Sequence, residues 1–110
     1  MTAPPIQLQP EHWEIVRSIL RSHVPDHAVW AFGSRARRTA KPHSDLDLAV
    51  ITVEPLTLDQ SAALAEAFAD SDLPFKVDLV DWSRIDGGFR KVIETDRVVV
   101  QPAAARRPAG

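Results

Sequence analysis

The sequence predicts a small α/β domain of the α+β kind, in which helices pack on a mixed β-sheet. Two patterns of apolar residues support this fold class. Some segments repeat their apolar residues with the period of a helix, and others are short apolar runs bounded by turn residues, as strands are. These segments follow one another in the order helix, strand, turn, strand, helix, strand, helix, strand. A length of 110 residues with 45% hydrophobic residues fits a single globular core.

The first helix is expected to begin near Pro10, because proline suits the first helical turn. Apolar residues then follow at helical spacing: Trp13, Val16, Ile19 and Leu20. Pro25 ends this helix. Residues 27–32 are apolar and aromatic and predict a strand, after which Gly33 marks a turn. Residues 46–52 predict the next strand, with β-branched side chains at its far end.

The second half of the chain predicts two more helices and two more strands. Thr57 followed by Gln60 is a capping-box pattern, which indicates that a helix begins there. Residues 75–81 alternate in character and predict a third strand. Ser83 is expected to cap a final helix that carries Ile85, Phe89, Val92 and Ile93. Residues 97–101 predict a last short strand.

The predicted domain covers residues 10–101. Residues 1–9 are proline-rich and are expected to form a flexible N-terminal arm, and residues 102–110 a flexible C-terminal tail. A net charge of −2 gives no global attraction to nucleic acid or membrane surfaces, so any basic site must be local. The chain has no cysteine, no apolar run long enough to span a membrane and no signal-peptide pattern, and we expect it in the cytoplasm.

Three aspartates fall on the predicted strands. Asp45 and Asp47 open one strand and are two residues apart, so their side chains share a sheet face about 6 to 7 Å apart. Asp78 lies in the middle of the next strand and joins them if the two strands are neighbours. Ionised carboxylates at this range repel one another and require a cation between them. Mg²⁺, which prefers oxygen ligands and substrate phosphates, is the natural candidate.

A Gly-Ser turn precedes these aspartates. Glycine at position 33 lets a ligand approach the backbone closely, and the hydroxyl of Ser34 together with neighbouring amides can hold a phosphate group. Arg35 can add a bidentate clamp on phosphate oxygens, and Arg37 or Arg38 can add charge at the rim. We therefore expect Gly33, Ser34 and Arg35 to bind the phosphate groups of a ligand, with Asp45, Asp47 and Asp78 as catalytic and metal-binding residues.

The spacing of these motifs resembles that of a known superfamily. Gly33-Ser34, ten further residues and then Asp45-Leu46-Asp47 form the signature of the nucleotidyltransferases that include DNA polymerase β. The stretch GSRARRTAKPHSDLDLAV and the later VDLVD and IETDRVVVQ are similar to the minimal nucleotidyltransferases, so the resemblance covers roughly residues 10–101. Arg38 stands where members of that family commonly have a glycine. The resemblance implies the polymerase β-like nucleotidyltransferase fold.

The resemblance also implies a function. Minimal nucleotidyltransferases are often the antitoxin partners of HEPN-domain toxins, and the implied substrate is ATP with two Mg²⁺ ions. For antitoxin members, the implied reaction transfers AMP to a tyrosine hydroxyl of the toxin and silences it. By this resemblance Gly33 and Ser34 hold the phosphates, Asp45 and Asp47 bind the metals, and Asp78 is the third carboxylate. A hetero-oligomer with the toxin is expected, and direct nucleic-acid binding is not.

Two alternatives remain open at this point. The domain could be a non-catalytic antitoxin that neutralises its partner by complex formation alone, although three converging carboxylates argue against a purely structural role. It could also be a nucleotidyltransferase of the antibiotic-modifying kind, which is less favoured because those enzymes carry an additional domain for the acceptor. Modification of the partner protein distinguishes the first alternative from the enzyme.

Overall fold

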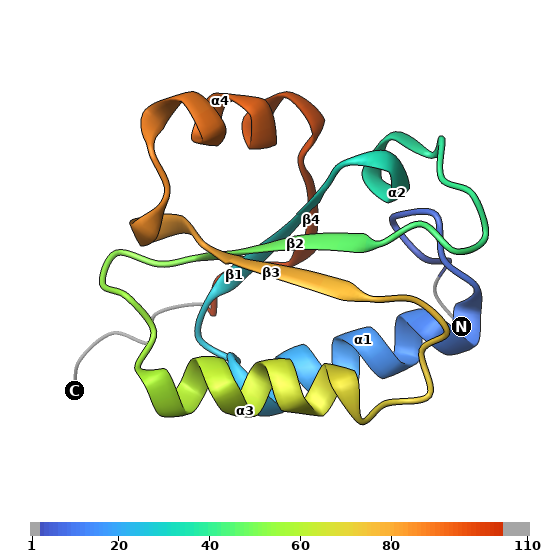
Figure 1. Ribbon diagram of the computed structural model, residues 1–110, viewed down its shortest axis with the longest axis horizontal. Helices are drawn as coiled ribbons and strands as arrows, with labels where there is room; N and C mark the ends of the chain where they lie inside the picture. The colour runs from blue at the N-terminus through green and yellow to red at the C-terminus, as the bar shows by residue number, and fades with distance from the viewer. Residues whose placement is uncertain (1–2, 105–110) are drawn as a thin grey trace.

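The computed structural model describes residues 3–104 (Figure 1). Four helices, four strands and one 3-10 turn follow in the predicted order, with the short helix α2 added at the Gly-Ser turn. The elements are α1 Pro10–His23, β1 Ala28–Phe32, α2 Ser34–Arg37, β2 Leu46–Ile51, α3 Leu58–Ala69, β3 Val77–Asp81, the 3-10 turn Trp82–Arg84, α4 Gly87–Asp96 and β4 Val98–Gln101. Within residues 3–104, no helix is both long and apolar enough to cross a membrane.

The four strands form one mixed sheet in the order β3-β2-β1-β4. β1 is antiparallel to both β2 and β4, and β3 is parallel to β2. The parallel pair is possible because α3 carries the chain back to the starting end of β2 before β3 begins. The predicted mixed sheet with packed helices is therefore confirmed, and β2 is one of its two central strands.

Helices cover the two faces of the sheet unequally. Figure 1 shows α1 and α3 side by side on one face of the sheet and α4 on the other, with the short α2 beside the end of β1. Leu46, Leu48 and Val50 of β2 point into the larger core under α1 and α3. Ala49 belongs to the smaller core under α4, with Phe32 and Ile93. Since strand side chains alternate, Asp47 lies on the face of α4.

The expectation of a flexible N-terminal arm is wrong for its described part. The side chain of Ile6 is only 1% exposed and packs in the larger core. The amide of Gln7 donates to the carbonyl of Arg35 at 2.9 Å, and its side-chain amide exchanges two hydrogen bonds of 2.9 Å with the backbone of Ala40. The prolines of this segment suggested that it is loose, but the buried side chain of Ile6 and the hydrogen bonds of Gln7 hold it against the domain. Residues 105–110 of the expected C-terminal tail lie outside the described residues.

The helix starts agree with the prediction in one case and differ in another. Thr57 and Gln60 form the predicted capping box at the start of α3. Helix α4, however, is capped by Asp86, whose carboxylate accepts from the amide of Phe89 at 2.8 Å, and not by Ser83. Ser83 lies in the 3-10 turn and bonds to Asp81 instead. Residues 82–84 form the 3-10 turn, so α4 begins only at Gly87 and the preceding Asp86 caps it.

Candidate active site

The register of the parallel strands brings two of the predicted aspartates together. Asp47 of β2 lies directly across from Asp78 of β3. Both side chains are partly buried, on the sheet face that α4 covers only in part. Asp45 is exposed and immediately precedes β2, where the loop after α2 joins the sheet. Residues 31 positions apart in the sequence thus become neighbours through strand pairing.

Asp47 is the residue on which the charges of the other two aspartates act. Burial raises the pKa of Asp47 above its usual value, and the negative charges of Asp78 and Asp45 raise it further, whereas Arg37 lowers it. The pKa of a carboxyl rises in this way when its ionised form is poorly solvated and repelled by neighbours. Asp47 is therefore the centre of the acidic group, and within residues 3–104 no cation lies within ion-pair distance of it.

Gly33 has a geometric reason to be glycine. Its φ of 75° lies in the left-handed region, and a Cβ at this position would collide with Oδ2 of Asp47. The backbone of the Gly-Ser turn is thus in contact with the central carboxylate. Ser34 follows as the first residue of α2. The predicted phosphate-binding turn and the carboxylate of Asp47 therefore lie side by side.

Arg35 does not have the position that the sequence suggested for a phosphate clamp. Its side chain is buried, at 5% exposure, and its guanidinium faces backbone carbonyls on the side of α1. Nε and Nη2 donate to the carbonyl of Ser44 at 2.9 and 2.7 Å, Nη2 to that of Pro42 at 3.1 Å, and Nη1 to that of Gln7 at 3.0 Å. We conclude that Arg35 holds the arm and the loop after α2 in place.

Arg37 is the basic residue that faces the acidic group. Its guanidinium pairs with Asp96 at the end of α4, with 2.6 Å between Nη1 and Oδ2, and half of its side chain is exposed. It is also the positive charge that lowers the pKa of Asp47. The sequence grouped Arg37 with rim charges. Helical spacing could have distinguished Arg37 from Arg35, because residues 34 and 37 lie on one face of a helix and residue 35 lies on another.

The three carboxylates are not arranged as a finished metal site. Over the described part of the chain, no three histidine, aspartate or glutamate side chains converge closely enough to hold a metal ion, so the predicted trio is not assembled. Ionised carboxylates at short range repel, and Asp78 pairs instead with Nζ of Lys76 at 3.3 Å. The donor set still fits Mg²⁺, since all three side chains offer carboxylate oxygens and Asp47 is short of positive charge.

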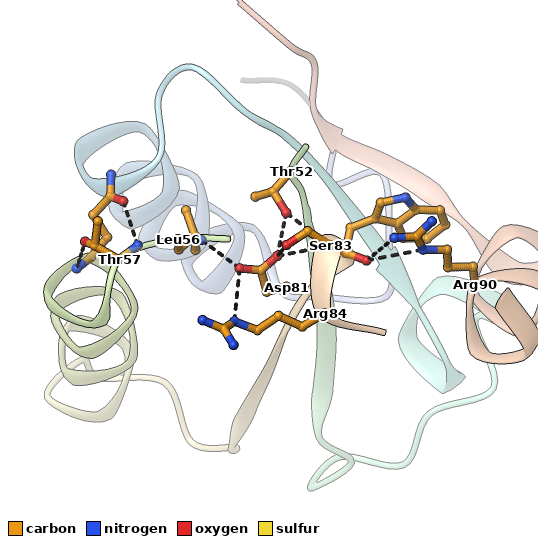
Figure 2. A network of polar contacts seen from close by, with 9 residues as sticks. Thr52, Leu56, Thr57, Asp81, Ser83, Arg84 and Arg90 are labelled. Carbon is orange, nitrogen blue, oxygen red and sulfur yellow. Dashed lines mark hydrogen bonds and ion pairs between the residues drawn. The ribbon is translucent and has the colours of Figure 1, made fainter. Parts of the chain in front are cut away.

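A polar network at the far end of β3 fixes the parallel strand pair (Figure 2). The carboxylate of Asp81 accepts hydrogen bonds from the hydroxyl of Thr52 at 2.5 Å, the amide of Leu56 at 2.8 Å, and the amide and hydroxyl of Ser83 at 3.0 and 2.7 Å. Figure 2 shows these groups arranged around Asp81, with Arg84 on the opposite side. Sequence reasoning assigned no role to Asp81. Asp81 accepts hydrogen bonds from four donor groups in two segments, and these bonds link β3 to the loop after β2.

Comparison with known proteins places this arrangement in a class. Residues 14–103 match the family described as "Polymerase beta, Nucleotidyltransferase". The chain belongs to this nucleotidyltransferase family, as both the fold and the pairing of Asp47 with Asp78 indicate. Within the family, it is 48% identical over 96 residues to "Probable protein adenylyltransferase MntA" of Haemophilus influenzae, a match that covers 87% of this chain and 84% of that protein. The resemblance noted in the sequence is thereby confirmed.

Solved structures agree with this assignment. A crystal structure of a toxin-antitoxin complex with AMP-PNP matches with a TM-score of 0.68 and 27% identity, over 80% of this chain and 71% of that one. The antitoxin fold also matches in a complex of a tri-AMPylated Shewanella oneidensis HEPN toxin with its MNT antitoxin, with a TM-score of 0.64 and 24% identity over 84% and 71% of the two chains. At 24% identity, the match to the Shewanella oneidensis complex shows a similarity of fold.

Proposed function

We propose that this chain is a Mg²⁺-dependent adenylyltransferase that acts as an antitoxin by transferring AMP from ATP to a tyrosine hydroxyl of a partner HEPN toxin. The observation that carries the proposal is the pairing of Asp47 with Asp78 beside the Gly33 turn. The MntA relative is named a protein adenylyltransferase, and a related toxin-antitoxin complex contains AMP-PNP, which supports ATP as the substrate. Because ATP is the proposed substrate, we propose the cytoplasm as the place of action.

The proposed roles follow from the positions of the side chains. Asp45, Asp47 and Asp78 are the residues that would hold two Mg²⁺ ions, which supply charge stabilisation to the attacking and departing oxygens. The backbone of Gly33 and the hydroxyl of Ser34 receive the phosphates next to Asp47. Arg37 takes the phosphate-binding role first considered for Arg35, because its guanidinium is half exposed on the acidic side.

The reaction assigned to this site is a single displacement. The acceptor hydroxyl oxygen attacks the α-phosphorus of ATP, a new P–O bond forms, and the bond to pyrophosphate breaks. The hydroxyl proton passes to Asp78, which is 42% exposed and therefore open to an incoming acceptor. The charge on the departing pyrophosphate is met by Arg37 and Ser34. The acceptor side chain comes from the partner.

Replacement of Asp47 by asparagine tests the proposal. We expect Asp47→Asn to reduce transfer of label from α-labelled ATP to the co-purified partner by at least about two orders of magnitude, the scale of losing one electrostatic stabiliser of a transition state. The circular dichroism spectrum stays unchanged, because the substitution preserves shape. Asp72→Asn, which alters an exposed loop aspartate, is the matched control and keeps full activity.

The mass of the partner decides between catalysis and binding alone. Incubation of the complex with ATP and Mg²⁺ is expected to add adenylyl units to the partner, and chelation of the metal by EDTA is expected to prevent the addition. Undiminished transfer by Asp47→Asn contradicts the assignment of the site. A stable complex whose partner never gains mass contradicts the proposed reaction and favours a non-catalytic antitoxin.

A further inference from the structure

A hollow lies beside the N-terminal arm, and Asp47 is not among the residues that line it. We call it the arm pocket; it has a volume of about 490 Å³ and is bounded by residues 7–9, the first turn of α1, the loop of residues 38–43 and residues 74–75. In Figure 1 these segments lie together near the N-terminus, whereas α4 lies on the other face. Of the residues predicted for the active site, Arg35 is in its lining, and the Gly-Ser turn and the three aspartates are not.

The arm pocket is lined by titratable residues of one kind. Its titratable lining residues are all basic: His12, Arg35, Arg38, Lys41 and His43. Within residues 3–104, no carboxylate lies within ion-pair distance of Arg35, Arg38 or Lys41. Arg35 donates to backbone carbonyls, and Asp45, which is outside the pocket lining, is the carboxylate whose charge acts on it. Guanidinium and ammonium groups gathered without counter-ions favour a ligand with several negative charges.

Arg38 contributes to the pocket from an unusual backbone conformation. Its φ of 61° is left-handed, a region that residues with a side chain seldom adopt. Its Nη2 donates to the carbonyl of Pro4 at 3.2 Å, which fixes the guanidinium beside the arm. A glycine would accept this backbone conformation more readily. Arginine at position 38 adds a positive charge to the pocket, although its backbone adopts a conformation that glycine would adopt more readily.

The wall of the pocket is aromatic. The guanidinium of Arg35 lies over the ring of Phe75 at 4.0 Å, and the ring of His12 meets Phe75 edge-on with 5.8 Å between centroids. A site with cations at its rim and aromatic rings at its wall suits a phosphorylated organic molecule better than a single inorganic ion. Its volume also exceeds what one phosphate needs.

We propose that the arm pocket binds the phosphate chain of a small polyanion, either free pyrophosphate or the di- or triphosphate of a nucleotide. Arg38 and Lys41 contact the phosphate oxygens, and Phe75 with His12 borders the remainder of the ligand. The loop of residues 38–43 forms the wall of the pocket and leads through Ser44 to Asp45. The proposal does not depend on the function proposed above.

Binding is measured with pyrophosphate on the full chain by amide chemical shifts, in EDTA so that the carboxylates are left without a metal. We expect saturable shifts at the amides of Ala40, Lys41 and Phe75, with smaller changes at Gly33 and Ser34. Shifts confined to Gly33 and Ser34 place the anion at the active site and overturn the proposal, as does the absence of saturable binding.

Paired charge deletions give the specificity control. The double variant Arg38→Gly with Lys41→Gln removes two cations from the pocket, and its glycine suits the left-handed backbone, so the fold is preserved. We expect its pyrophosphate affinity to fall roughly tenfold or more. The matched control, Arg21→Gln with Lys91→Gln, removes two exposed cations elsewhere and changes the affinity by less than about twofold. Equal loss in both double variants means non-specific attraction and overturns the proposal.

ATP and a short RNA oligonucleotide distinguish the sources of the phosphate. Tighter binding of ATP than of pyrophosphate at the same amides supports a nucleotide ligand, and the reverse order supports free pyrophosphate. Binding of RNA without binding of either small anion contradicts the proposal and points to a macromolecular ligand.

Discussion

At the scale of single residues, two arginines of one short basic run have opposite environments. Arg35 is buried and bonded to carbonyls of the arm and the following loop, whereas Arg37 is half exposed and lies close enough to Asp47 to lower its pKa. They sit two residues apart on a four-residue helix, which turns their side chains to different sides. Composition alone could not separate them.

Substitution of these two arginines is expected to divide stability from activity. Arg35→Gln removes the donors of three partly buried carbonyls and should lower the free energy of unfolding by about 2 to 4 kcal/mol. Arg37→Gln should change the free energy of unfolding by less than about 1 kcal/mol, because the ion pair of Arg37 with Asp96 is partly exposed. This substitution should instead raise the KM for ATP.

Urea denaturation and initial rates of transfer measure the two effects. Arg35→Lys is a useful addition, because a single ammonium cannot reproduce the planar set of donors and should not restore stability. A stable Arg35→Gln variant with a raised KM for ATP contradicts the roles assigned here and restores Arg35 as a phosphate ligand.

At the scale of elements, the parallel pair of β2 and β3 is what brings Asp47 and Asp78 together. Asp47 pairs with Asp78, and three residues further on Val50 pairs with Asp81. The hydrogen bonds of Asp81 to the loop after β2 hold this register at the far end of the strands. A slip of one residue would move Asp78 to the other face of the sheet.

Asp81→Asn is expected to destabilise the protein in a pH-dependent manner. Burial by itself raises the pKa of Asp81, but hydrogen bonds from Thr52, Ser83 and the amide of Leu56 outweigh it, so the pKa lies below its usual value. A carboxyl whose pKa is lower in the folded state stabilises the fold when ionised. This stabilisation is present above the unfolded-state pKa and is lost as the pH falls through the folded-state pKa.

The measurement compares Asp81→Asn with the wild type by urea denaturation at several pH values. We expect a deficit of about 1 to 3 kcal/mol at pH 7, which shrinks as the pH falls from about 5 towards 2. Asp72→Asn changes an exposed loop aspartate and provides the comparison. A deficit that stays constant over this range means that the charge of Asp81 contributes nothing to stability.

At the scale of the whole molecule, the N-terminal arm completes the core. Ile6 is 1% exposed and packs with residues of α1 and the central strands, and Gln7 and Arg35 bond the arm to the loop that leads to Asp45. The domain thus begins before the first helix. The active-site loop is held from behind by a segment that the sequence places far from it.

Ile6→Ala tests whether the arm is part of the folded domain. Deletion of buried methyl and methylene groups should lower the free energy of unfolding by about 2 to 4 kcal/mol. Val53→Ala shortens an aliphatic side chain that is 96% exposed and should change it by less than about 0.5 kcal/mol. Thermal unfolding followed by circular dichroism measures both. Equal midpoints for the two variants indicate a loose arm.

Local patterns in the sequence predict the class of fold, the order of the elements along the chain, and the motif that carries the family resemblance. Periodicity and turn residues are local, so the capping box at Thr57 and Gln60 and the strand that contains Asp47 could be read directly. The motif spacing is also local to one loop and two strands. These features needed no knowledge of which segments touch.

Contacts in the folded chain establish which of these groups meet. It paired Asp47 with Asp78, turned Arg35 inward and Arg37 outward, moved the cap of α4 to Asp86, and buried Ile6. Each outcome depends on contacts between segments distant in sequence, and the free energy of such contacts is set by burial and strand pairing that no local pattern encodes. One segment of the chain therefore carries most of the motif, and strand pairing in the sheet brings Asp47 next to Asp78.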